Sequence, residues 1–334
     1  MVNLIDFPAF QALQFQILYI QIFGSFISFL LNILWIKLLI SHQRVFDLFP
    51  YSAAAADTLR SISSIVFGLI HATNGSYSTG FVGCQIDGYI TITTASISTM
   101  SLLCLILDPL LIVVFRKSRL TTQMRMMILS NLWTGIPILS LIPIVTDGAK
   151  YHIHQTGTYC MICFTCLQNY WNVIVVYLTM GGLLSVPIGM LITFSLTYYI
   201  ITKRANSSGG ATSVEEIQRE LIKRGLTITI FHALAWFPSL AAMISTMHGH
   251  YDSQSMVYLD IVAQLTGIFA LSINPIIFFY LEGHALKMFK KFQLNSSFYK
   301  LSSKSVKSSK GSNQVNVFNP NTTEDLAVTR IIPK

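Results

Sequence analysis

Charged residues are scarce in this sequence. Asp, Glu, Lys and Arg make up 11% of the 334 residues, whereas in a soluble domain they make up about a quarter. Hydrophobic residues reach 52% and are gathered into long runs. This composition excludes a soluble globular domain and indicates that most of the chain lies within a lipid bilayer.

Features that would indicate an enzyme are also missing. The sequence shows no Gly-rich phosphate loop, no paired carboxylates expected to share one pocket and no nucleophile with its base. Five cysteines are too few for a disulfide scaffold, and they lack metal-ligand spacing with histidines. We therefore expect neither an enzyme nor a resident metal cluster.

The positive charge of the chain does not indicate nucleic-acid binding. The net charge is +8, but the Lys and Arg residues lie in short segments between apolar runs and in the C-terminal tail. A removable signal peptide is not expected, because the first residues lack a basic start followed by a short apolar core. The first apolar run is then expected to direct membrane insertion itself.

Seven apolar runs dominate the chain, and each is long enough to cross a hydrocarbon core, which takes about 20 helical residues. They cover residues 15–40, 51–70, 84–115, 126–145, 171–201, 226–247 and 256–281. The sequence therefore predicts an all-α integral membrane protein: an N-terminal segment over 1–14, a seven-helix transmembrane domain over 15–281, an amphipathic membrane-surface helix over 282–294 and a disordered tail over 295–334.

The distribution of basic residues predicts the orientation. The loops after the first, third and fifth runs carry Lys and Arg, whereas the opposite loops carry almost only Lys150. By the positive-inside rule the N-terminus is outside and the tail is cytoplasmic, as in a multi-pass plasma membrane protein. The Asn74-Gly75-Ser76 triplet then lies outside and is a predicted glycosylation site.

Polar residues within the apolar runs need a purpose, because a charge at mid-membrane costs about 2.5 to 3.5 kcal/mol on insertion scales. Asp57 follows four alanines, and Arg60 lies one helical turn further on. This pair either neutralises itself or forms a polar switch. Asp87 and Asp260, near the outer ends of their runs, are expected to face solvent.

The order of motifs resembles the rhodopsin-like family of G protein-coupled receptors. The matching residues are Asn32, Asp57, Cys84, Asp108, Trp133, Pro187, Trp236 with Pro238, and Asn274-Pro275-Ile276-Ile277-Phe278, in which Phe replaces the final Tyr of the family motif. The resemblance covers all seven runs. It implies an extracellular ligand, a heterotrimeric G protein and contact with membrane lipid. The Ser-rich tail (302–312) is either phosphorylated to recruit an arrestin-like regulator or a solvated linker.

The resemblance also implies several sites. A polar switch that binds sodium would comprise Asn32, Asp57, Ser98 and Asn274, and a disulfide would join Cys84 to Cys160, Cys163 or Cys166. Candidates for the ligand pocket are Thr91, Trp236, Met243 and Gln264. The cytoplasmic cleft for the G protein would be bordered by Arg116, Lys117, Lys223 and Arg224. Ile268 replaces the lysine that retinal requires, so no cofactor is expected.

Three departures from the family pattern bear on signalling. Pro109 follows Asp108 where the family has arginine, His232 replaces an aromatic residue below Trp236, and Ser195 stands near the place of a tyrosine. The preferred function is a receptor in which helix six swings about Pro238, with Pro275 kinking helix seven. The alternatives are a decoy receptor that does not couple to G proteins, and a seven-helix transporter or channel.

Overall fold

The computed structural model describes the following residues: 8–41, 48–74, 80–115, 120–145, 151–153, 160–162, 188–189, 191–192, 195–200, 202–203, 226–227, 230–242, 244–245 and 258–279. The chain divides into two compact units, Met1–Leu281 and Glu282–Lys334. The second unit, which contains the predicted surface helix and tail, lies outside the described residues.

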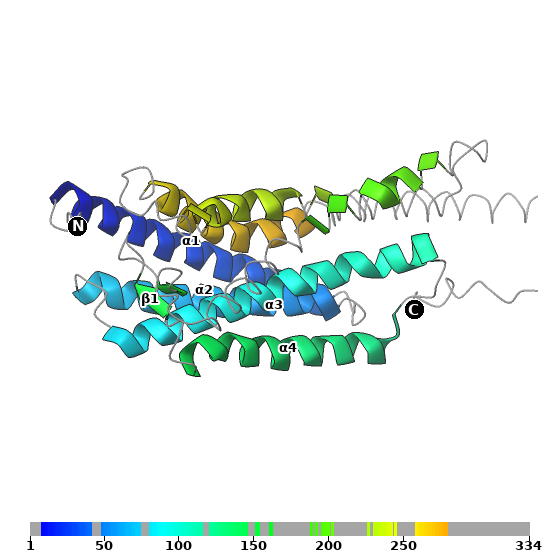
Figure 1. Cartoon of the computed structure of the whole chain (residues 1–334), viewed down its shortest axis with the longest axis horizontal. Coiled ribbons are helices and arrows are strands. Elements are labelled where there is room, and N and C mark those ends of the chain that lie inside the picture. Colours follow the sequence, from blue (N-terminus) through cyan, green and yellow to red (C-terminus); the bar gives the residue numbers. More distant parts are fainter. Residues whose placement is uncertain are drawn as a thin grey trace, which may run out of the picture. The chain divides into compact units, whose positions relative to one another are not determined.

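Long helices make up the first half of the chain (Figure 1). They are α1 (Pro8–Ser41), α2 (Leu48–Asn74), α3 (Gly80–Phe115) and α4 (Thr122–Val145), and further helices cover Ile230–Ala242 and Tyr258–Phe279. A helix satisfies its backbone hydrogen bonds internally, which lipid requires. Thr121 caps α4: its Oγ1 accepts a hydrogen bond from Met124 N at 3.2 Å.

The helices match the predicted membrane spans. Among the described residues, five helices are long and apolar enough to cross a membrane: Leu13–Ile40, Leu48–Asn74, Gly80–Leu105, Thr122–Val145 and Tyr258–Phe279. They correspond to runs one to four and seven. The sixth run is represented by the shorter apolar helix Ile230–Ala242, and most of the fifth lies outside the described residues.

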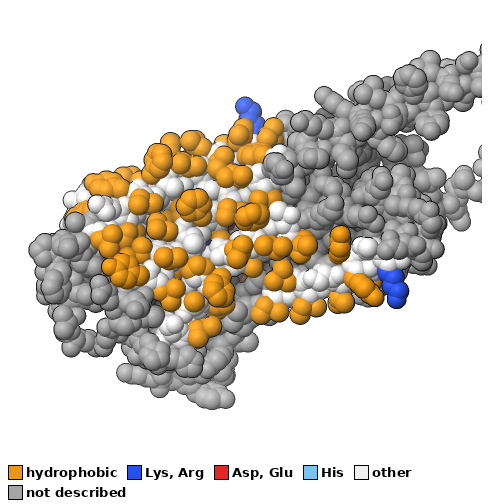
Figure 2. All heavy atoms as spheres, turned by 90° about the horizontal axis from the view of Figure 1, so that it is seen from above, with side chains coloured by type: hydrophobic (Ala, Val, Ile, Leu, Met, Phe, Trp, Pro, Cys, Tyr) orange, Lys and Arg blue, Asp and Glu red, His pale blue; other side chains and the backbone are white. Residues whose placement is uncertain are grey.

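The outer surface of these helices is apolar. Large hydrophobic side chains such as Phe23, Met127 and Phe269 are 63% to 66% exposed. In the face shown in Figure 2, hydrophobic side chains cover most of the described surface, and the visible Lys and Arg side chains lie at its margins. Such a surface would be unfavourable in water and is suited to contact with lipid.

Small and polar residues hold the helices together. Helix α2 packs against both α1 and α3, and Ala53, Ala54 and Ala56 on it are completely buried, because small side chains allow close approach of helices. Trp133 Nε1 of α4 donates a hydrogen bond to Ser52 Oγ at 2.9 Å. Ser52 Oγ is in turn 2.8 Å from Ser101 Oγ, so one polar chain links α4, α2 and α3.

Helix α1 packs along the helix Tyr258–Phe279. Trp35 stacks on Phe278 with ring centroids 4.5 Å apart, and Ser28 Oγ is hydrogen-bonded to Ser272 Oγ. This position explains Phe278, which replaces the family tyrosine: its ring contacts another aromatic ring, where a hydroxyl is not needed.

A short β-hairpin is present that the sequence analysis did not predict. Strands β1 (Tyr151–Ile153) and β2 (Cys160–Ile162) pair antiparallel, with Tyr151 opposite Ile162 and Ile153 opposite Cys160. Three-residue strands carry too little periodic pattern to be recognised from sequence. Both strands pack against α3, where they form part of the disulfide site described below.

Candidate functional site

A buried polar cluster joins α2 to the helix Tyr258–Phe279. Asn274 Nδ2 donates a hydrogen bond to Asp57 Oδ2 at 3.1 Å, and both side chains are 2% exposed. Ser98 of α3 is close enough to interact with the Asp57 carboxyl, but its hydroxyl lacks a full hydrogen bond. Three of the four residues predicted for the polar switch therefore meet.

The amide nitrogen of the fourth residue, Asn32, does not bond to the Asp57 carboxylate. Its Nδ2 donates hydrogen bonds to Ser28 O at 2.9 Å and to Leu271 O at 3.0 Å. Asn32 thus ties α1 to the backbone of the helix Tyr258–Phe279, three residues before Asn274. Its Oδ1 is buried without a hydrogen-bond partner.

Arg60 reaches across the bundle from α2. The carbon of its guanidinium lies 5.3 Å from the centre of the Trp236 ring, and a Cβ at Gly267 would be 3.6 Å from its Nη2. Arg60 interacts electrostatically with Asp57 and Asp87. Arg60 therefore interacts with the charges of two carboxylates and with an aromatic face.

A polar contact lies below Trp236. His232 Nε2 is 3.1 Å from Thr99 Oγ1, which joins the helix Ile230–Ala242 to α3. The His232 and Trp236 rings are 6.1 Å apart between centroids. The sequence identified His232 as a departure from the family, but its partner Thr99 was missed, because a threonine in an apolar run gives no signal by itself.

The Thr99–His232 contact is expected to stabilise the protein, which can be tested by substitution. Thr99→Val keeps the shape of the side chain but removes the hydroxyl, leaving His232 Nε2 without this partner in a buried position. We expect the free energy of unfolding to fall by about 1 to 3 kcal/mol. Thermal melts of the purified protein check this, with Thr266→Val as control, because Thr266 bonds only carbonyls of its own helix.

Equal effects of the two substitutions would contradict the prediction. In that case the hydroxyl of Thr99 would stabilise its own helix and not the contact between helices. A His232→Phe variant adds a second test: it restores the aromatic residue of the family and is expected to make Thr99→Val harmless, because no imidazole is then left unpaired.

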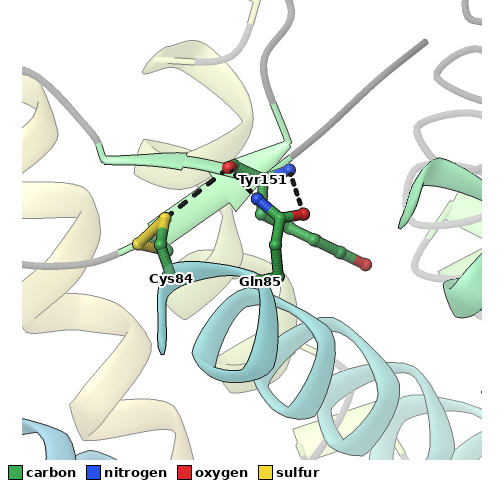
Figure 3. The surroundings of a disulfide bond; sticks show 4 residues. Cys84, Gln85 and Tyr151 are labelled. Carbon is green, nitrogen blue, oxygen red and sulfur yellow. Dashed lines mark hydrogen bonds between the residues drawn. A yellow bond between two sulfur atoms is a disulfide. The ribbon is translucent and has the colours of Figure 1, made fainter. Parts of the chain in front are cut away.

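The N-terminal end of α3 carries a disulfide. Cys84 is bonded to Cys160 of β2, with Cα atoms 5.4 Å apart. The sequence left three candidate partners for Cys84, and the structure selects Cys160; Cys163 and Cys166 lie outside the described residues. Cys84 Sγ is also 3.6 Å from Tyr151 O (Figure 3). This is a packing contact, because a disulfide sulfur has no proton to donate.

Gln85 and Tyr151 hold the hairpin on α3. Gln85 Nε2 donates to Tyr151 O at 2.6 Å, and Tyr151 N donates to Gln85 Oε1 at 3.1 Å (Figure 3). This two-way pairing satisfies both the amide and the backbone of β1. Adding a Cβ at Gly88 would place it 2.4 Å from Tyr151 Cδ1, so the ring lies where only glycine leaves room.

Tyr151 is anchored at its other end as well. Its hydroxyl donates a hydrogen bond to Ser140 O of α4 at 3.0 Å, and the residue is 1% exposed. Burial raises the pKa of the Tyr151 hydroxyl above its ordinary value. The group therefore remains protonated, and able to donate, at any physiological pH.

The structure corrects one expectation and locates others. Asp87 and Asp260 were expected to face solvent, but they are only 7% and 1% exposed, because a position near a helix end is buried when other parts of the chain pack over it. Thr91 is half-buried on α3. Gln264 Nε2 donates to Gln21 Oε1 of α1, so this amide binds a neighbouring helix.

Several predicted residues are outside the described part of the chain. These are Pro187, Met243 and the four residues of the cytoplasmic cleft, Arg116, Lys117, Lys223 and Arg224. Asn74 is exposed at the end of α2, and α3 remains helical through Asp108 and Pro109 to Phe115. The proline that replaces the family arginine therefore does not end the helix.

An apolar helical bundle with a disulfide at one end and a buried polar cluster defines a helical membrane protein. The family model "7 transmembrane receptor (rhodopsin family)" matches residues 14–278. The chain belongs to this family. The predicted fold class, an all-α seven-transmembrane bundle, and the resemblance noted from the sequence are thereby confirmed, and the family is one of receptors, not enzymes.

Two individual similarities agree with the family. The chain is 22% identical over 262 residues to the tachykinin-like peptides receptor 86C of Drosophila melanogaster, which covers 72% of this chain and 51% of that receptor. The chain thus matches about half the length of this relative. The crystal structure of squid rhodopsin superposes with a TM-score of 0.56 at 14% identity, covering 80% of this chain and 81% of that one.

Proposed function

We propose that the protein is a plasma membrane receptor with its N-terminus outside, which binds an extracellular ligand between the outer halves of its helices and signals to a heterotrimeric G protein. The observation that carries this proposal is the position of Trp236. Its ring lies against Arg60 of α2 and near His232, which contacts Thr99 of α3.

This arrangement supports a mechanism of population shift. A ligand that displaces Trp236 would disturb contacts with two other helices at once. Pro238 follows two residues later in the same helix, and a proline lacks the backbone N–H that would resist bending there. Helix six then moves about Pro238 and opens the cytoplasmic cleft bordered by Arg116, Lys117, Lys223 and Arg224.

A peptide is the ligand class that we propose to test first. The Drosophila relative is named for tachykinin-like peptides, and Thr91 on α3 provides no anionic partner for an amine ligand. Retinal is not expected as a ligand, because Ile268 has no amine and lies against Gly24 of α1, within 2.8 Å of where a Cβ at that glycine would be.

The proposal is tested by a G-protein dissociation assay in cells across a panel of G proteins. The native chain is compared with Pro109→Arg, which restores the family arginine and also replaces a poor helix former. We expect the native chain to give a basal signal with at least one G protein and Pro109→Arg to give a larger one. Surface expression of both chains, measured with an N-terminal tag on intact cells, is the control and also tests the orientation.

Two other results would assign a different function. A signal from Pro109→Arg alone indicates a decoy receptor, in which Pro109 has removed the coupling. No signal from either chain at full surface expression, together with solute or ion flux, indicates the transporter or channel. Neutralising the four cleft residues should abolish any signal; an unchanged signal would contradict the assignment of the cleft.

A further inference from the structure

The charge balance of the Asp57 cluster differs from what a sodium site needs. The cluster offers oxygen atoms to a cation: those of the Asp57 carboxylate, and Ser98 Oγ, which is buried without a hydrogen-bond partner. Oxygen atoms of this kind are the ligands that hard cations prefer. However, a positive charge already acts on this carboxylate. It is the guanidinium of Arg60, which lies on the same membrane-spanning helix as Asp57.

Arg60 is held in place by groups that suit a guanidinium. Its carbon lies 5.3 Å from the centre of the Trp236 ring, which attracts a cation through the negative face of the ring. Gly267 leaves the neighbouring helix without a side chain at this point, and its Cβ position is 3.6 Å from Nη2. Asp57 and Asp87 both attract the charge. An arginine remains charged under all physiological conditions.

We infer that Arg60 is the built-in counter-ion of Asp57 and takes the place of a sodium ion in this cluster. A sodium ion bound to Asp57 would lie beside a permanent positive charge inside a water-poor bundle, where repulsion is only weakly screened. The residues present therefore do not fit sodium. Unlike a diffusible ion, Arg60 is tethered to α2 and also contacts Trp236, so it connects the polar cluster directly to that aromatic residue.

The inference predicts how thermal stability depends on sodium. The purified protein in detergent is melted in sodium chloride and in potassium chloride at equal ionic strength, with tryptophan fluorescence as readout. We expect the same Tm in both salts for the native chain and for Arg60→Lys, which keeps the charge. Arg60→Leu removes the charge and is expected to show a sodium-specific rise of about 3 °C or more.

Controls separate the cluster from general salt effects. Asp57→Asn in the Arg60→Leu background is expected to abolish the sodium effect, because the anionic ligand is gone. If Arg60→Leu does not fold, Arg60→Gln replaces it as a neutral polar variant. A sodium-specific rise in the native chain equal to that of the neutral variant would overturn the inference, and so would a folded neutral variant with no sodium response. No G protein is involved, so the result is independent of whether the receptor couples.

Discussion

Replacing Cys84 and Cys160 together with alanine is expected to lower the free energy of unfolding by about 2 to 4 kcal/mol. The bond joins residues 76 positions apart and limits the freedom of the unfolded chain across that whole interval. It also fixes β2 on α3, and β2 in turn pairs with β1, whose Tyr151 contacts Gln85 and Ser140. Loss of the bond is therefore expected to loosen the contacts of the hairpin with α3 and α4 as well.

Chemical denaturation of the purified protein, followed by tryptophan fluorescence, measures this effect. Cys104→Ala is the matched control, because Cys104 is a half-buried free cysteine of α3 that forms no disulfide. We expect the control to change stability by much less than the double variant. If the double variant unfolds at the same denaturant concentration as the control, the bond does not stabilise the fold and the hairpin is held by Gln85 and Tyr151 alone.

Replacing Asn274 with leucine is expected to cost about 1 to 3 kcal/mol of stability and to abolish regulated signalling. The Nδ2 atom of Asn274 donates to the Asp57 carboxylate at 3.1 Å, and both side chains are buried. Without the amide, the carboxylate loses a donor that water does not replace. The contact also joins α2 to the helix Tyr258–Phe279, so its loss uncouples the two helices.

A residue exchange distinguishes this contact from simple packing. The double variant Asp57→Asn with Asn274→Asp still places one carboxylate opposite one amide. We expect it to be more stable than the sum of the two single changes by about 1 kcal/mol. Strict additivity would show that the two side chains do not interact. Thr73→Ala, which removes an exposed hydroxyl bonded only to its own helix, is the control and should change stability by less than about 0.5 kcal/mol.

The sequence by itself determined the membrane bundle and the family. An apolar run of sufficient length becomes a helix in lipid whatever surrounds it, because backbone hydrogen bonds must be satisfied within the segment. For that reason the runs ending at Ile40 and Val145 reappear as the spans Leu13–Ile40 and Thr122–Val145. The order of Asn32, Asp57, Trp236 and Asn274 then identified the family without any contact being known.

Only the tertiary structure decided which side chains meet. The choice of Cys160 for Cys84 depends on the pairing of β1 with β2, and the burial of Asp87 and Asp260 depends on which neighbours cover their helices. Likewise, the sequence placed Arg60 within reach of Asp57, and the structure shows that it also lies over Trp236, 176 positions away in sequence. Such contacts depend on the rotation of each helix about its axis, which is set by packing against neighbours and is not encoded in the composition of a single span.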